Sequence, residues 1–238
     1  RGLGDVYKRQ KLICFPCAGG NAKSFAKLIR GIHCFAICAE YSGHWSRYEE
    51  PLYYSMEDCI QYQMQELREK ITLQDEIFLL GHSMGALIAF ELGKNLLNAG
   101  YNVKGLYLLA CMPPDEINDT DFNFEDDEEI KLFLKRINQM PESVLNSDFF
   151  RENLLPSIRN DFRILKNFIS SYSSREAIDC NIVCMCAEQD SLANEMCGWQ
   201  RYSQKKIKEY YYPGNHFFFH EKENTEKIVE LINLEISD

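Results

Sequence analysis

The chain has 238 residues, of which 45% are hydrophobic and 26% are charged. This composition is typical of a soluble globular protein, and the length is sufficient for one large core with an insertion. The net charge of −10 argues against a nucleic acid or an anionic membrane as a partner, because phosphate groups would be repelled.

The ten cysteines could suggest a disulfide scaffold, but five of them lie inside short apolar runs, at positions 14, 34, 38, 184 and 186. A reduced cysteine packs in such a run as a small hydrophobic side chain. No Cys/His cluster has the spacing of zinc ligands, so we expect no metal and no other cofactor. Free thiols are typical of a reducing compartment, which predicts a cytoplasmic protein. No apolar run approaches the roughly 18 residues of a membrane span.

The opening segment, residues 1–10, has no helical or strand period, and we expect it to be a non-native or disordered leader. The pattern that follows predicts a strand over residues 12–15, a turn over 16–21, a helix near 24–30 and a strand over 34–39. Ser55 has the features of an N-cap, with Asp58 three positions later. Apolar residues at helical spacing follow, which predicts a helix over residues 55–71.

The same alternation continues to the end of the chain. A strand over residues 77–80 ends at Gly81, and a helix over 84–99 is stopped by Gly100. Further strands are expected over 103–111, 181–187 and 206–212, with helices near 192–203 and 224–236. Strands that alternate with helices require crossover connections, so we predict a single α/β domain over residues 11–238. Its central sheet should be mainly parallel, with helices on both faces.

Residues 113–172 interrupt this alternation. They carry an acidic run over 125–129 and then helical periods around 130–137 and 158–169. We predict a helical insertion that lies over the carboxyl ends of the strands, where loops form sites, and that covers the substrate as a lid. A packed helical excursion without a gating role is the simpler alternative.

The pentapeptide Gly81-His82-Ser83-Met84-Gly85 fits the pattern G-x-S-x-G. A nucleophilic serine must project from a sharp, strained turn between a strand and a helix, and glycines on both sides leave room for that turn. A strand is expected before this segment and a helix after it, as the pattern requires. The sequence therefore predicts a nucleophile elbow with Ser83 as the nucleophile.

A serine hydroxyl is a poor nucleophile without a base. In this fold class the triad order along the chain is Ser, acid, His, so the base should come late. His216 follows a strand in the turn Pro213-Gly214-Asn215-His216, where a loop would present an imidazole, and we favour it over His220.

The acid of the triad should follow an earlier strand. Asp190 lies in the turn directly after the expected strand 181–187, from which it could accept a hydrogen bond from the imidazole. Glu188 is its nearest competitor. We predict a triad of Ser83, Asp190 and His216.

An oxyanion hole needs two backbone donors. Elbow geometry assigns one of them to the N–H of Met84, the residue after the nucleophile. The second should come from the loop after the first strand, where the paired glycines Gly19 and Gly20 let the backbone approach closely. Cys17 and Ala18 are both candidates for this donor.

Four segments together resemble the type II thioesterases, the stand-alone editing hydrolases of non-ribosomal peptide and polyketide synthesis. Residues 14–20, CFPCAGG, resemble the FPxAGG loop of the family, and residues 81–92, GHSMGALIAFEL, resemble its elbow and helix. Residues 159–163, RNDFR, resemble its R-x-D-x-R segment at the end of the lid, and residues 213–218, PGNHFF, resemble its GxHFF ending. The resemblance covers nearly the whole chain from Lys11.

The chain departs from the family pattern at two places. The first loop has Cys17 where the family usually has His. The loop after the second strand reads Ser42-Gly43-His44 where the family usually has P-G-R, with Arg47 a few residues later. The triad is unaffected, so these changes are expected to alter substrate preference or surface contacts near the site entrance.

The resemblance implies an α/β-hydrolase fold and hydrolysis of thioesters, without a metal or redox cofactor. The substrate would be an acyl group on the phosphopantetheine arm of a carrier protein, and the enzyme would be a monomer. An esterase or acyltransferase acting on small free substrates is the alternative within enzymes. A carrier-binding module without turnover is the alternative from another class.

Overall fold

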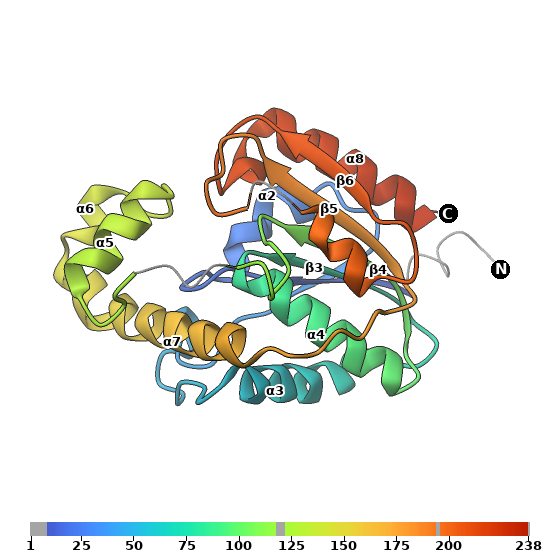
Figure 1. Cartoon of the computed structure of the whole chain (residues 1–238), viewed down its shortest axis with the longest axis horizontal. Coiled ribbons are helices and arrows are strands. Elements are labelled where there is room, and N and C mark those ends of the chain that lie inside the picture. Colours follow the sequence, from blue (N-terminus) through green and yellow to red (C-terminus); the bar gives the residue numbers. More distant parts are fainter. Residues whose placement is uncertain (1–8, 118–121, 194–195, 238) are drawn as a thin grey trace.

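Six parallel strands form one sheet in the order β2-β1-β3-β4-β5-β6 (Figure 1). The computed structural model describes residues 9–117, 122–193 and 196–237. The strands are β1 (Gln10–Phe15), β2 (Phe35–Cys38), β3 (Glu76–His82), β4 (Asn102–Leu109), β5 (Asn181–Ala187) and β6 (Lys208–Tyr212). The six strands lie where the sequence predicts them, and the mainly parallel α/β-hydrolase sheet is confirmed. β3 runs through Gly81 to His82 rather than ending at Leu80.

The strand register brings distant loops to one edge of the sheet. Phe15 is paired with Gly81, and Ala187 is paired with Tyr212. The loops that follow β1, β3, β5 and β6 therefore begin side by side at the carboxyl ends of the strands. Sites in parallel sheets form at this edge.

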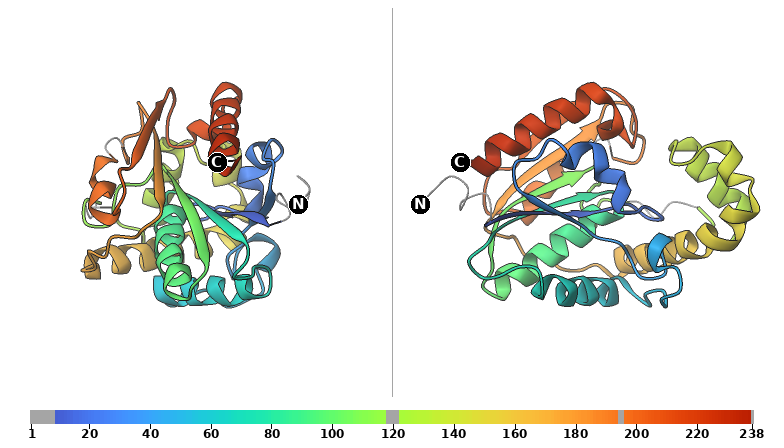
Figure 2. Two further views of the ribbon diagram at one scale, coloured as in Figure 1. Left: turned by 90° about the vertical axis from the view of Figure 1, so that its right-hand side faces the viewer. Right: turned by 180° about the vertical axis from the view of Figure 1, so that it is seen from behind.

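Helices cover both faces of the sheet (Figures 1 and 2). One face carries α3 (Met56–Arg68) and α4 (Met84–Asn98), and the other carries α2 (Ala26–Ile29) and α8 (Lys222–Ser237). Successive strand residues point to opposite faces, so Ile13 packs in the first core and Leu12 in the second. Both faces are buried, which explains why the strands are apolar throughout.

Helix α3 begins where the sequence predicts it. The Ser55 side chain accepts a hydrogen bond from the backbone N–H of Asp58 at 3.1 Å, which satisfies one of the free donors of the first turn. The helix ends at Arg68, three residues before the expected Ile71, whose N–H bonds to the Leu67 carbonyl outside the regular helix.

The helices between β4 and β5 join the sheet only in part, through Ile164 and Phe168, which pack in the first core. They are α5 (Asp127–Arg136), α6 (Glu142–Leu145), the π-helical turn η3 (Phe150–Leu154) and α7 (Leu155–Ser171), and we call residues 113–172 the insertion. The insertion has a small core of its own, which includes Ile130, Leu134 and Phe150. Helices α5 and α6 project beyond the carboxyl ends of the strands, opposite to the two chain termini (Figures 1 and 2). The expectation of a lid stays a prediction.

The helix expected near residues 192–203 is wrong in type and length. Residues 191–193 are irregular, and a 3₁₀ helix, η4, covers only Cys197–Tyr202. Trp199 decides this local geometry, since its ring lies 5.0 Å from that of Phe90 and its Nε1 donates to the Cys111 carbonyl at 2.7 Å. Long-range packing of one aromatic residue thus overrides the local helical period.

All ten cysteines are free thiols. Cys14 and Cys17 have Cys-x-x-Cys spacing, but Cys14 lies within β1, and burial followed by the charge of Asp161 raises the pKa of Cys17 to about 12. Residues 1–8 lie outside the described chain, while Gln10 belongs to β1 and bonds the Ile236 carbonyl at 2.7 Å. Among the described residues no helix is long and apolar enough to cross a membrane.

Candidate active site

Ser83 occupies the sharp turn between β3 and α4. Its backbone has φ 54° and ψ −123°, outside the regions that L-residues prefer. Such strain persists only where the surroundings enforce it, and it is common at functional sites. The two flanking glycines are needed for space. A Cβ on Gly81 would lie 2.1 Å from the Gly85 carbonyl oxygen, and one on Gly85 would lie 2.1 Å from that of Phe15.

His216 and Asp190 meet at the same edge of the sheet. Nδ1 of His216 donates to Oδ2 of Asp190 at 2.8 Å, and both side chains are almost fully buried. Asp190 directly follows β5, and His216 follows β6, and the two residues meet because these strands are neighbours in the sheet. Ser83 and His216 line one cavity. The structure thus brings together the three residues predicted as a triad.

The two competing candidates lie elsewhere. His220 ends the short helix η5 (Phe218–His220), and its Nε2 bonds the Ser24 carbonyl at 3.0 Å. Glu188 is exposed in the turn before Asp190. Neither residue lines the cavity that contains Ser83.

His82, the residue before the serine, is buried under His216. Its Nε2 donates to the backbone carbonyl of His216 at 2.8 Å, and the two rings lie 4.8 Å apart. Burial, and then the positive charge that His216 can carry, hold the pKa of His82 well below its ordinary value. His82 is therefore a neutral donor that anchors the backbone of the His216 loop, a contact that the sequence analysis did not predict.

The backbone donors expected for an oxyanion also border the cavity. Met84 is the first residue of α4, where backbone N–H groups have no partner within the helix. Cys17 and Ala18, in the loop after β1, line the cavity together with Ser83. Both candidates for the second donor thus border the same cavity as the nucleophile.

Asp161 of α7 joins the insertion to this loop. Its Oδ2 accepts from the Gly19 N–H at 2.8 Å and from Nε2 of His44 at 2.9 Å. Nδ1 of His44 faces the Ser42 carbonyl at 3.0 Å, so both ring nitrogens face acceptors and the ring is an imidazolium. Burial alone would lower the pKa of His44, but the charge and hydrogen bond of Asp161 outweigh it, and the pKa is raised.

The sequence predicted that the change to His44 would alter substrate preference or surface contacts near the site entrance, and the prediction of surface contacts is wrong. Its side chain is 1% exposed, so it makes no surface contact at the site entrance. It forms a buried ion pair with Asp161, 117 residues later in the chain. Arg159 and Arg163, which belong to the same segment as Asp161 (residues 159–163), instead bond other residues of the insertion. Arg159 bonds the Phe124 carbonyl at 3.0 Å, and Arg163 pairs with Glu125 at 3.1 Å.

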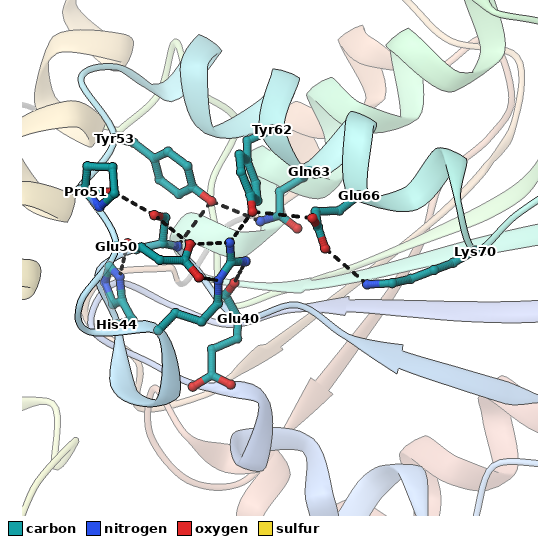
Figure 3. A network of polar contacts seen from close by, with 11 residues as sticks. Glu40, His44, Glu50, Pro51, Tyr53, Tyr62, Gln63, Glu66 and Lys70 are labelled. Carbon is teal, nitrogen blue, oxygen red and sulfur yellow. Dashed lines mark hydrogen bonds and ion pairs between the residues drawn. The ribbon is translucent and has the colours of Figure 1, made fainter.

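The loop that carries His44 is held by a polar network on α3 (Figure 3). Arg47 donates to the Glu40 carbonyl at 2.9 Å, pairs with Glu50, and contacts the Tyr62 hydroxyl. The Ser42 hydroxyl donates to the Pro51 carbonyl at 2.6 Å. A second cavity of about 380 Å³ adjoins this network. Among the charged side chains that line it, Arg47 pairs with Glu50 and Lys70 with Glu66.

The cavity above Ser83 has a volume of about 450 Å³ and extends under the insertion. Phe122, Phe133 and Phe162 line one side and pack against each other, with ring centres 4.9 to 5.4 Å apart. An aromatic wall of this kind suits an apolar group. Among the described residues, no group of three or more His, Cys, Asp or Glu side chains could hold a metal ion.

Residues 10–236 match the family model described as "Thioesterase domain". The chain belongs to the thioesterase domain family. It is thus an enzyme that hydrolyses thioesters, and the resemblance expected from the sequence is confirmed.

Individual relatives agree with this assignment. The thioesterase is 25% identical to Thioesterase PikA5 of Streptomyces venezuelae over 89% of this chain and 76% of that protein. It is 27% identical to the gramicidin S biosynthesis protein GrsT of Aneurinibacillus migulanus, over 89% and 83%. The solved structure of YbtT, a type II thioesterase from the yersiniabactin NRPS/PKS biosynthetic pathway, has the same fold. It superposes with a TM-score of 0.84 at 20% identity, over 96% of this chain and 95% of that one.

Proposed function

We propose that this thioesterase removes acyl groups from the phosphopantetheine arm of carrier proteins in non-ribosomal peptide or polyketide synthesis. The observation that carries the proposal is Ser83 on a strained elbow, in one cavity with a buried His216–Asp190 pair. GrsT and YbtT, which are named for biosynthetic pathways of this kind, support the substrate class. The enzyme would act as a monomer, without a cofactor.

In the first step Ser83 Oγ attacks the carbonyl carbon of the thioester, and Nε2 of His216 takes the serine proton. Asp190 accepts from Nδ1 and stabilises the imidazolium that forms. The carbonyl electrons move to the oxygen, which the N–H of Met84 and that of Cys17 or Ala18 would stabilise. Each such donor is worth about 3–4 kcal/mol in the transition state.

Collapse of this intermediate breaks the carbon–sulfur bond. His216 returns the proton to the pantetheine thiol, which leaves, and the acyl group stays on Ser83. His216 then takes a proton from water, whose oxygen attacks the ester carbonyl carbon. The bond from this carbon to Ser83 Oγ breaks, His216 returns the proton to Oγ, and the free acid is released. The aromatic side of the cavity would hold the acyl chain, and the insertion would act as the lid over this intermediate.

The proposal is tested by acyl release from an acyl-loaded carrier protein and from a small ester of the same acid. We expect a strong preference for the carrier in the wild type. Ser83→Ala should lose about 10³-fold or more of the activity, because no nucleophile remains. Equal or faster release from the small ester would contradict the carrier assignment and favour an esterase. Full activity of Ser83→Ala would contradict the proposed nucleophile.

A further inference from the structure

The loop after β1, residues 16–20, is held by all of its carbonyl groups from Pro16 to Gly19. We call these residues the oxyanion loop. The donors are Tyr41 Oη to Pro16 at 2.8 Å, Gly20 N to Cys17 at 2.9 Å, Gln139 Nε2 to Ala18 at 2.8 Å and Trp45 Nε1 to Gly19 at 3.3 Å. The C=O and N–H of a trans peptide point in opposite directions. Each of these bonds therefore also fixes the direction of the next N–H along the chain.

Two N–H groups of this loop stay available. Among the described residues, neither the N–H of Cys17 nor that of Ala18 donates a hydrogen bond to another residue of the protein. Gly19 and Gly20, by contrast, donate to Asp161 and to the Cys17 carbonyl. The free donors are thus the two residues that border the cavity beside Ser83.

The insertion holds one peptide group of this loop from both sides. Gln139 donates to the Ala18 carbonyl, and Asp161 accepts from the Gly19 N–H, which belongs to the same peptide. Ile158 of α7 packs directly on Gly19, where an added Cβ would lie 2.4 Å from its Cγ1. No residue of the sheet or of its covering helices duplicates these two bonds to the Ala18–Gly19 peptide among the described residues.

We propose that Gln139 and Asp161 are positioning residues that hold the oxyanion loop in its catalytic geometry, so that the insertion completes the oxyanion hole. This inference rests on the proposed function of Ser83. It gives the insertion a part in the chemical step in addition to covering the acyl group. When the insertion is displaced, the loop loses both bonds, and stabilisation of the oxyanion is lost with them.

Local structure explains how the two side chains reach the loop. Helix α5 is followed by Asn138, whose φ of +57° turns the chain so that Gln139 faces the cavity. Asp161 lies on the buried face of α7 and is 1% exposed. His44, whose other ring nitrogen bonds the Ser42 carbonyl, donates to the same oxygen of Asp161 that accepts from Gly19 and so helps to hold this carboxylate in place.

The test compares Gln139→Ala and Asp161→Ala with the matched control Asn160→Ala. Asn160 also joins α7 to the sheet side, through the Tyr53 carbonyl at 3.0 Å, but it does not touch the oxyanion loop. On a small ester we expect kcat to fall about 10-fold for Gln139→Ala and about 100-fold for Asp161→Ala, with little change in KM. Asn160→Ala should keep the wild-type kcat. Gln139 is only partly buried, so this variant tests the proposal even if Asp161→Ala does not fold.

An inhibitor pair separates positioning from general stability. Ser83 Oγ adds to the carbonyl carbon of an acyl trifluoromethyl ketone and the carbonyl oxygen becomes an oxyanion, while His216 takes the serine proton. The corresponding alcohol has the same shape but cannot be attacked. We expect both variants to lose affinity for the ketone in parallel with kcat/KM, and to bind the alcohol as the wild type does.

Three results would overturn the inference. The first is a wild-type kcat in Gln139→Ala, matched by a wild-type kcat in Asp161→Ala if that variant folds. The second is an equal loss of affinity for the ketone and the alcohol, which would assign both residues to acyl binding. The third is a kcat for Asn160→Ala as low as that for Gln139→Ala. The ketone carries no pantetheine, so these results do not depend on the carrier preference, and failure of the wild type to bind it would instead contradict the role of Ser83.

Discussion

Two buried histidines near the active site have opposite charge states. His44 and His82 are each 1% exposed. His44 lies between the Ser42 carbonyl and the Asp161 carboxylate and carries a positive charge. His82 lies against the rings of His216, Phe217 and Phe219 and stays neutral. The two equally buried side chains thus have opposite pKa shifts. The direction depends on whether the ring also faces a carboxylate, as His44 does with Asp161 and His82 does not.

The difference also separates two ways of supporting an active site. His82 is the last residue of β3 and holds the backbone of His216 by one neutral hydrogen bond. His44 acts through a charge pair that joins the loop after β2 to the insertion. The first support is made within the sheet, whereas the second exists only while the insertion is docked. We therefore expect the second to be more sensitive to substitution.

The largest effect is expected when the charge pair is broken. Asp161→Ala leaves a buried imidazolium and the Gly19 N–H without their acceptor, and removal of one partner from such a pair costs about 3–5 kcal/mol. His82→Phe, in its aromatic surroundings, loses one hydrogen bond and should cost about 1–2 kcal/mol. The free energies of unfolding in urea at neutral pH measure both. Equal costs would contradict the distinction between the two sites.

A smaller effect on the free energy of unfolding is expected from a change in pH, with opposite signs for the two histidines. The pKa of His82 is depressed below 6.5, so its contribution to stability is complete above that pH and is lost as the pH falls below it. The pKa of His44 is raised above 6.5 by Asp161, the Ser42 carbonyl and Glu40, despite burial. Its contribution is complete below pH 6.5 and is lost as the pH rises through the raised value. A tenfold change in proton affinity between the folded and unfolded states corresponds to about 1.4 kcal/mol of stability.

Unfolding measured from about pH 5 to about pH 9 checks these signs. We expect His82→Phe to remove part of the loss of stability at low pH, and His44→Gln to remove part of the loss of stability at high pH. His216 and His220 face His82, so the acid limb should shrink without vanishing. The opposite assignment of the two limbs would show that the charge states are reversed.

The smallest effect is expected in the exposed part of the network in Figure 3. Glu50 pairs with Arg47 at 2.5 Å, but 41% of the Glu50 side chain is exposed. Exposed pairs are worth about 0–1 kcal/mol, so Glu50→Gln should change stability by less than about 1 kcal/mol and leave kcat unchanged. A loss as large as that of Asp161→Ala would show that the loop depends on this pair to hold His44.

Features that depend on neighbouring residues were predictable from the sequence. The Ser55 cap, the strands formed by apolar runs and the elbow at Ser83 follow from local sterics and hydrogen bonding. The helix expected over residues 192–203 failed because Trp199 packs on Phe90 and bonds the Cys111 carbonyl. Gln139 was missed because nothing in the surrounding sequence marks a polar residue that reaches the loop after β1, 121 residues earlier.

By itself, the sequence determined the α/β alternation, the strained serine turn and the candidates His216 and Asp190, because these features depend on local conformation and on the order of elements along the chain. Only the tertiary structure decided the charge of His44, the neutral state of His82 and the contacts of Asp161 and Gln139 with the oxyanion loop. The physical reason is that a buried polar group takes its charge and role from its partners, and these partners lie more than 100 residues away along the chain.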